Sequence, residues 1–145
     1  RETAFLNNVH LTLWHADERK AAATPDGWGA NISFSRLISE HWTTFVRAGY
    51  ADDGGSLLET SLVGGFGYQT VPGGNQLGVA YNWGKPNKSS WGPGLDDQHT
   101  LEVFYRIQVW KELAITPDIQ YIRNPALNTE DDTDWVFGLR ARLAF

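Results

Sequence analysis

The amino-acid sequence predicts an all-β protein, an antiparallel up-and-down transmembrane β-barrel in which eight strands are present. Eight segments alternate apolar and polar side chains with a period of two, which is typical of strands with one apolar face. Most of these segments are close to the ~9–11 residues that a tilted strand needs to cross a bilayer. The connections between them also alternate between long and short. In a meander, this alternation places long loops at one rim and tight turns at the other, as in outer-membrane barrels.

The expected strands follow one another from the first residues to the last. They are residues 4–14, 28–37, 42–51, 57–69, 76–83, 100–110, 113–123 and 134–145. The long connections are residues 15–27, 84–99 and 124–133, and the DDGGS segment at 52–56 occupies the same rim. The short connections are residues 38–41, 70–75 and 111–112. We treat the whole chain as a single barrel region, since 145 residues are one domain's worth of protein.

Each strand contributes to one apolar face. In strand order, this face collects Val9, Leu11 and Leu13; Trp28, Ala30, Ile32 and Phe34; Val46, Ala48 and Tyr50; Leu58, Leu62, Phe66 and Tyr68; Leu77, Val79, Tyr81 and Trp83; Leu101, Val103, Tyr105, Ile107 and Val109; Ile115, Ile119 and Tyr121; and Trp135, Phe137, Leu139, Ala141, Leu143 and Phe145. The aromatic residues of this face gather near strand ends, as in the aromatic girdles of membrane barrels.

The opposite face is polar. In strand order, it collects Asn8, His10 and Thr12; Asn31, Ser33 and Ser35; Thr43, Phe45, Arg47 and Gly49; Glu59, Ser61, Gly65 and Gly67; Gly78, Ala80 and Asn82; Glu102, Phe104, Arg106 and Gln108; Asp118 and Gln120; and Arg140 and Arg142. Alternation alone does not decide which face is inside, and a soluble ligand-binding barrel would reverse the two. The terminal aromatics and the glycines of the polar face favour a barrel in lipid.

Composition excludes several other classes. The net charge of −5 and the absence of a basic run disfavour a nucleic-acid partner. The absence of cysteine excludes disulfides and cysteine-ligated metals. No segment has the ~18–20 consecutive apolar residues of a spanning helix. The chain starts at Arg1 without an initiating Met or a signal segment, so we expect a processed chain or a piece of a longer one.

Several stretches resemble the carbohydrate-selective porins of bacterial outer membranes, the OprB family. They are PDIQYIRNP at 117–125, the closing residues 135–145, FVRAGY at 45–50 and LGVAY at 77–81. The resemblance implies a sugar porin, and Phe145 is similar to the C-terminal signal read by the barrel assembly machinery. Porins of that family resemble 16-stranded barrels. The eight strands here would therefore be the C-terminal half of such a barrel, or would close alone as an eight-stranded barrel.

A sugar channel needs rigid donors, acceptors and an aromatic ring on its polar face, because sugars combine hydroxyl groups with apolar ring faces. The predicted pore-lining, substrate-binding residues are Arg47, Glu59, Glu102, Phe104, Arg106, Asp118, Gln120, Arg140 and Arg142. Phe45 and Trp110 are further candidates for stacking. The resemblance implies an eyelet of arginines facing acids and aromatics, with Arg106, Arg140 and Arg142 first. Alternatively, Glu102 and Arg106 pair across strands with Asp118, Gln120 and Arg140 and only satisfy a polar lumen.

The predicted function is passive, substrate-biased diffusion of sugars, with no enzymatic activity, no cofactor and no metal. The expected partners are mono- or oligosaccharides, outer-membrane lipid and lipopolysaccharide, the assembly machinery, and further copies of the chain in a homo-oligomer. The alternative is a small barrel with a structural, adhesive or lipid-modifying role. His10 with Ser33, Ser35 and Ser61 would serve the lipid-modifying version, although no G-x-S-x-G motif supports it. Glu130, Asp131, Asp132 and Asp134 fail the Ca²⁺-loop spacing, and we interpret them as a solvated loop.

Overall fold

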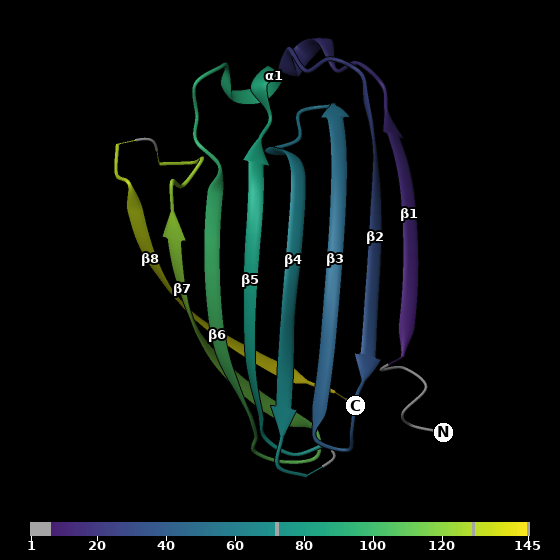
Figure 1. Ribbon diagram of the computed structural model, residues 1–145, viewed down its shortest axis with the longest axis vertical. Coiled ribbons are helices and arrows are strands. Elements are labelled where there is room, and N and C mark those ends of the chain that lie inside the picture. Colours follow the sequence, from purple (N-terminus) through teal and green to yellow (C-terminus); the bar gives the residue numbers. More distant parts are fainter. Residues whose placement is uncertain (1–6, 72, 129, 145) are drawn as a thin grey trace.

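Eight strands form one antiparallel sheet in the order of the sequence (Figure 1). The computed structural model describes residues 7–71, 73–128 and 130–144. The strands are β1 (Asn8–Ala16), β2 (Gly27–Leu37), β3 (Trp42–Asp53), β4 (Leu58–Gln69), β5 (Gln76–Pro86), β6 (Gln98–Gln108), β7 (Leu113–Arg123) and β8 (Thr133–Leu143). The predicted all-β, up-and-down fold is confirmed. The expected ends at residues 4–6 and at Phe145 lie outside the described residues.

The sheet is curved, but it does not close in the described part of the chain. Register pairs join each strand to the next, and none joins β1 to β8, so these two strands form its edges (Figure 1). The self-closed eight-stranded barrel that we considered from the sequence is therefore not what the structure shows. Closure requires β1 to pair with β8. The alternation of side chains within each strand does not predict whether these two strands pair.

Long and short connections lie at opposite ends of the sheet. The long ones are at the upper end in Figure 1, and two of them contain short helices, the 3₁₀ helix η2 (Lys20–Ala22) and α1 (Lys88–Trp91). The short turns after β2, β4 and β6 are at the lower end. Among the residues that the structure describes, no helix has the length and hydropathy needed to span a bilayer.

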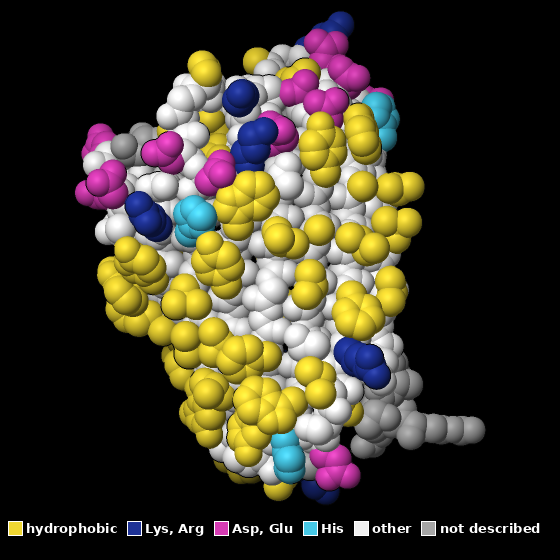
Figure 2. Space-filling view, in the orientation of Figure 1, with side chains coloured by type: hydrophobic (Ala, Val, Ile, Leu, Met, Phe, Trp, Pro, Cys, Tyr) yellow, Lys and Arg dark blue, Asp and Glu magenta, His cyan; other side chains and the backbone are white. Residues whose placement is uncertain are grey.

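Nothing in the described part of the chain packs against the apolar face of the sheet. Of the described hydrophobic residues only Ala114 and Ala126 are buried, whereas Phe137 is 74% and Leu139 is 76% exposed. Figure 2 shows this face, with hydrophobic side chains spread over the strands and charged groups gathered mainly toward the two ends. A soluble barrel would have placed these side chains in a core. The apolar face is therefore the outer face, and the polar face lines the hollow side.

Hydrogen bonds join the β5–β6 connection to the turn between β3 and β4. Asn87, only 4% exposed, donates from Nδ2 to Ser56 Oγ at 2.7 Å, and its Oδ1 accepts from Ser89 N at 3.0 Å. Trp91 Nε1 donates to the Leu57 carbonyl at 2.9 Å. These bonds tie the β5–β6 connection to the turn between β3 and β4, so this loop is held against the rim.

Replacing Asn87 by alanine is expected to release the β5–β6 connection, because Ser56 Oγ and the backbone of α1 lose their partners at a cost of about 1–3 kcal/mol. Trypsin should then cut after Lys88 at least about fivefold faster, since cleavage follows the population of the open loop. Asn128→Ala, in the β7–β8 connection, serves as the control. Equal cleavage rates in both variants, followed by mass spectrometry of the fragments, would contradict the role of Asn87.

Candidate functional site: a polar cavity on β6, β7 and β8

Charged and aromatic side chains converge on the polar face of the last three strands. The register places Glu102 opposite Gln120, Phe104 opposite Asp118, and Thr116 opposite Arg140. Because residues directly opposite each other in an antiparallel pair share a face, these side chains point to the same side. They surround a cavity of about 210 Å³ lined by Glu102, Phe104, Arg106, Ala114, Thr116, Asp118, Arg140 and Arg142.

A proline opens the sheet beside Arg106. The β6–β7 pairing stops at Phe104 opposite Asp118 and resumes only at Ile107 opposite Ile115. Pro117 lies in the gap and has no N–H to donate to a ladder. Arg106 Nη2 donates to Gln108 Oε1 at 2.6 Å, while its buried Nε has no hydrogen-bond partner in the described residues. The Arg106 side chain also lines the cavity.

Two phenyl rings of the polar face lie against glycines of the neighbouring strands. A Cβ added at Gly78 would overlap the Phe104 ring, and one added at Gly65 would lie 2.8 Å from Phe45 Cε1. Each pair is also in register across the sheet. Without a side chain beneath it, a ring can lie flat on the wall and present its face to the lumen. The glycines therefore leave room for both rings to lie against the wall.

The charges of the cavity are not neutralised by one another. The only ion pairs within 4.0 Å in residues 7–71, 73–128 and 130–144 are His15–Asp17 and Lys85–Glu59. Among the described hydrogen bonds, the cavity's carboxylates receive one side-chain hydrogen bond, from Gln120 Nε2 to Asp118 Oδ1 at 3.5 Å. The alternative interpretation, in which Glu102, Arg106 and Arg140 pair across strands, is therefore not what the structure shows. The arginines and carboxylates remain available to a solute.

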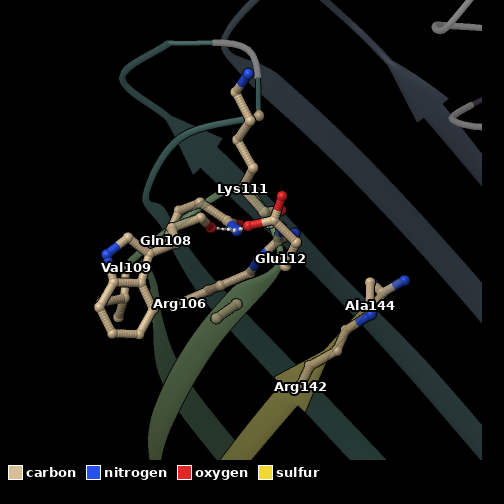
Figure 3. Close-up of a pocket in the computed structure, with 10 residues that line it drawn as sticks. Arg106, Gln108, Val109, Lys111, Glu112, Arg142 and Ala144 are labelled. Atoms are coloured by element: carbon tan, nitrogen blue, oxygen red, sulfur yellow. Dashed lines mark hydrogen bonds between the residues drawn. The ribbon is translucent and has the colours of Figure 1, made fainter.

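A second, wider cavity adjoins the first at the short-turn rim. It measures about 580 Å³ and shares Arg106, Ala114 and Arg142 with the first. Figure 3 shows Arg106 beside Gln108, with Lys111 and Glu112 from the turn and Arg142 from β8 around the same space. The two cavities therefore form a continuous polar surface from mid-sheet to the short-turn rim. Gln108, Thr116, Lys111 and Glu112 were not among the predicted site residues, although Gln108 shares the polar face with Arg106.

The family of the chain follows from its sequence match. The model of the carbohydrate-selective porin family, the OprB family, matches residues 4–145. The chain belongs to that family. No curated protein matches it, and neither does any solved structure. Membership in a porin family implies an outer-membrane location, and the outward apolar face agrees with it.

Three predicted residues of this porin do not line the cavity. Gln120 is opposite Glu102 in register but is not part of the lining. Arg47 is opposite Val63 on β3 and β4, on the polar face but outside the cluster. Glu59 is different, because a β-bulge between Leu58 and Thr60 shifts the register there. The Glu59 carboxylate contacts Lys85 Nζ at 2.8 Å.

Because of this bulge, Glu59 lies on a different face of the sheet from the one predicted from the sequence. Lys85 is opposite Thr60, which is opposite Tyr50, and Tyr50 belongs to the apolar face. Glu59 therefore pairs at the rim of the outer face and does not line the pore. Leu58, expected on the outer face, instead lies within 2.8 Å of the position of a Cβ at Gly84 on the polar face. An inserted residue in one strand has this effect because it reverses the alternation on one side of the bulge.

The remaining candidates take no part in the cavity on β6–β8. Trp110 follows β6 in the turn, is 66% exposed, and borders only the wider cavity. His10 is opposite Ser33 in register, with no hydrogen bond between their side chains among the described contacts. Asp131 and Asp134 each accept a hydrogen bond from Asn128 Nδ2 at 3.2 Å, and no cluster of acids or histidines in the described residues is arranged to hold a metal. Phe145 lies outside the described residues.

Proposed function

We propose that this porin conducts sugars across the bacterial outer membrane by passive, substrate-biased diffusion along its polar face. The observation that carries the proposal is the convergence of Arg106, Arg140 and Arg142 with Phe104 on one cavity. The family match supports a carbohydrate as the solute class. The long-loop end is then the outside of the cell and the short-turn end is the periplasmic side.

The residues of the cavity suit a sugar because they combine three kinds of contact. The guanidinium groups supply fixed, planar hydrogen-bond donors. Glu102 and Asp118, with Gln120 opposite Glu102 beside the cavity, supply acceptors for hydroxyl groups. Phe104 supplies an apolar surface for one face of the ring. The contacts are few and open to water, so a solute is retained briefly and then leaves, as diffusion through a selective pore requires.

Further contacts of the porin belong to the same proposal. The barrel assembly machinery would recognise Phe145. The outer face would contact lipid, and lipopolysaccharide where the long loops reach the outer surface. Copies of the chain would associate side by side through outer faces, as a homo-oligomer. None of these contacts needs a cofactor or a chemical step.

The test is single-channel conductance in a planar bilayer, with mono- and oligosaccharides added as blockers. We expect discrete steps that sugars interrupt, and about tenfold weaker interruption for Arg106→Gln, because a hydrogen bond to a charged group contributes about 1.5–3 kcal/mol. Arg36→Gln is the matched control, since Arg36 is opposite Thr44 in the alternation of the apolar face. Steps that sugars never interrupt, or equal loss in both variants, would refute the proposed role of the cavity.

A further inference from the structure

A second site lies on the outer face, near the long-loop end of β5, β6 and β7. A hollow of about 340 Å³ is lined there by Tyr81, His99, Leu101, Tyr121 and Arg123. All three strands are paired on both sides, so this part of the wall is complete in the described residues. The hollow is separate from the polar cavity, because Tyr81, Leu101 and Tyr121 are in register with one another on the apolar face.

Two rows of side chains cross this region. The first row runs from Tyr81 through Leu101 and Tyr121 to Trp135. The next row toward the long loops, which we call the basic row, runs from Trp83 through His99 to Arg123. Figure 2 shows a histidine and a basic side chain side by side, directly above hydrophobic side chains on this part of the face. Tyrosine and tryptophan are typical of the membrane interface, so the basic row lies at the level of the headgroups.

A hydrogen bond orients His99 in the basic row, and both His99 and Arg123 keep groups that can bind an external ligand. Tyr81 Oη and His99 Nδ1 are 2.6 Å apart, which fixes the imidazole and leaves its Nε2 without a hydrogen bond to any described residue. Arg123 is exposed, with no carboxylate within 4.0 Å in the described residues. The acid closest along the chain to His99 is Asp97, and it accepts from Trp83 Nε1 at 3.0 Å. Arg123 therefore offers donors to an external anion, and His99 Nε2 adds one in the tautomer whose Nδ1 accepts from the Tyr81 hydroxyl.

We propose that this hollow binds a phosphorylated glycolipid of the outer leaflet. Its phosphate lies at Arg123 and His99, because guanidinium and imidazole donors suit a phosphate anion. Its sugar lies against Tyr81 and Tyr121, and its acyl chains continue over Leu101 onto the apolar face. This inference rests on the proposed function, which takes the long-loop end as the outer surface and brings lipopolysaccharide to the outer face there, and it names the residues that would hold the lipid. The lipid remains bound to the wall and does not pass through the pore.

Native mass spectrometry of the detergent-purified protein, titrated with diphosphorylated lipid A, tests the proposal. The wild type should retain this lipid at least about tenfold better than the same lipid without its phosphates, and Arg123→Gln should lose about tenfold in affinity. Arg36→Gln, an arginine of the outer face near the opposite end of the sheet, is the control and should bind as the wild type does. Circular dichroism confirms that each variant is folded.

Three outcomes would overturn the proposal. They are equal retention of the dephosphorylated lipid, equal retention of phosphatidylglycerol in place of the glycolipid, and equal loss in the two arginine variants. A chain-to-chain cross-link at Arg123→Cys would also overturn it, since a second copy would then cover the hollow. Sugar interruption of conductance is measured separately. Arg123→Gln should keep it, so failure of the lipid site and failure of the proposed pore give different results.

Discussion

Replacing Ile119 by arginine should destabilise the folded protein by about 2–4 kcal/mol, whereas arginine at the adjacent Gln120 should cost less than about 1 kcal/mol. Ile119 is opposite Val103 and Phe137, in the middle of the outer face. In a membrane, its replacement would place a guanidinium in the hydrocarbon, which is costly at the midplane. Gln120 is opposite Glu102 on the polar face, where a guanidinium meets water and a carboxylate.

The two variants form a matched pair because they place the same side chain one residue apart in one strand. Unfolding by urea from lipid vesicles measures the difference in the free energy of unfolding. A barrel that folds in water with its apolar face inside would also reject arginine at position 119. Folding must therefore also be followed in buffer alone, where we expect no native sheet. A native sheet in buffer without lipid or detergent would contradict the outward assignment of the apolar face.

Side-chain alternation predicted most of this fold because each strand has one apolar and one polar face over its whole length. Strands β6, β7 and β8 were found in this way, and so was the convergence of Arg106, Arg140 and Arg142 on one face. Alternate positions along a strand point to opposite faces. The side to which each of these arginines points was therefore predictable without knowing which strands are neighbours.

Other features depend on the partner of each strand and were not predictable. The bulge at Leu58 and Thr60 changes the face of Glu59, but the sequence of β4 fits an unbroken alternation equally well. The gap in the ladder beside Pro117 matters only because Arg106 lies within it on β6, and that requires the register between β6 and β7. The missing pairing between β1 and β8 is likewise a property of the assembled sheet.

Replacing Gly78 by alanine should affect both stability and sugar selection. The new methyl group would overlap the Phe104 ring, which must then leave the wall and turn into the lumen. Forcing an extra methyl group into a close-packed position costs about 1–3 kcal/mol. The displaced ring would also occupy the space beside Arg106 and Asp118, where the proposed sugar contacts lie. We therefore expect about a tenfold change in sugar interruption of conductance.

Gly64→Ala supplies the control, because Gly64 is on the neighbouring strand β4 and no atom lies within 4 Å of the position of its added Cβ. Its methyl group would point to the outer face, where Val46 and Tyr81 are its register partners. Both variants lose the same backbone freedom, so the entropic gain of replacing glycine by alanine, about 0.5–1 kcal/mol, is common to them. A difference between the two therefore measures the contact with Phe104 alone. If Gly78→Ala and Gly64→Ala have the same stability and the same response to sugars, Phe104 does not provide the flat surface on which the proposed selectivity depends.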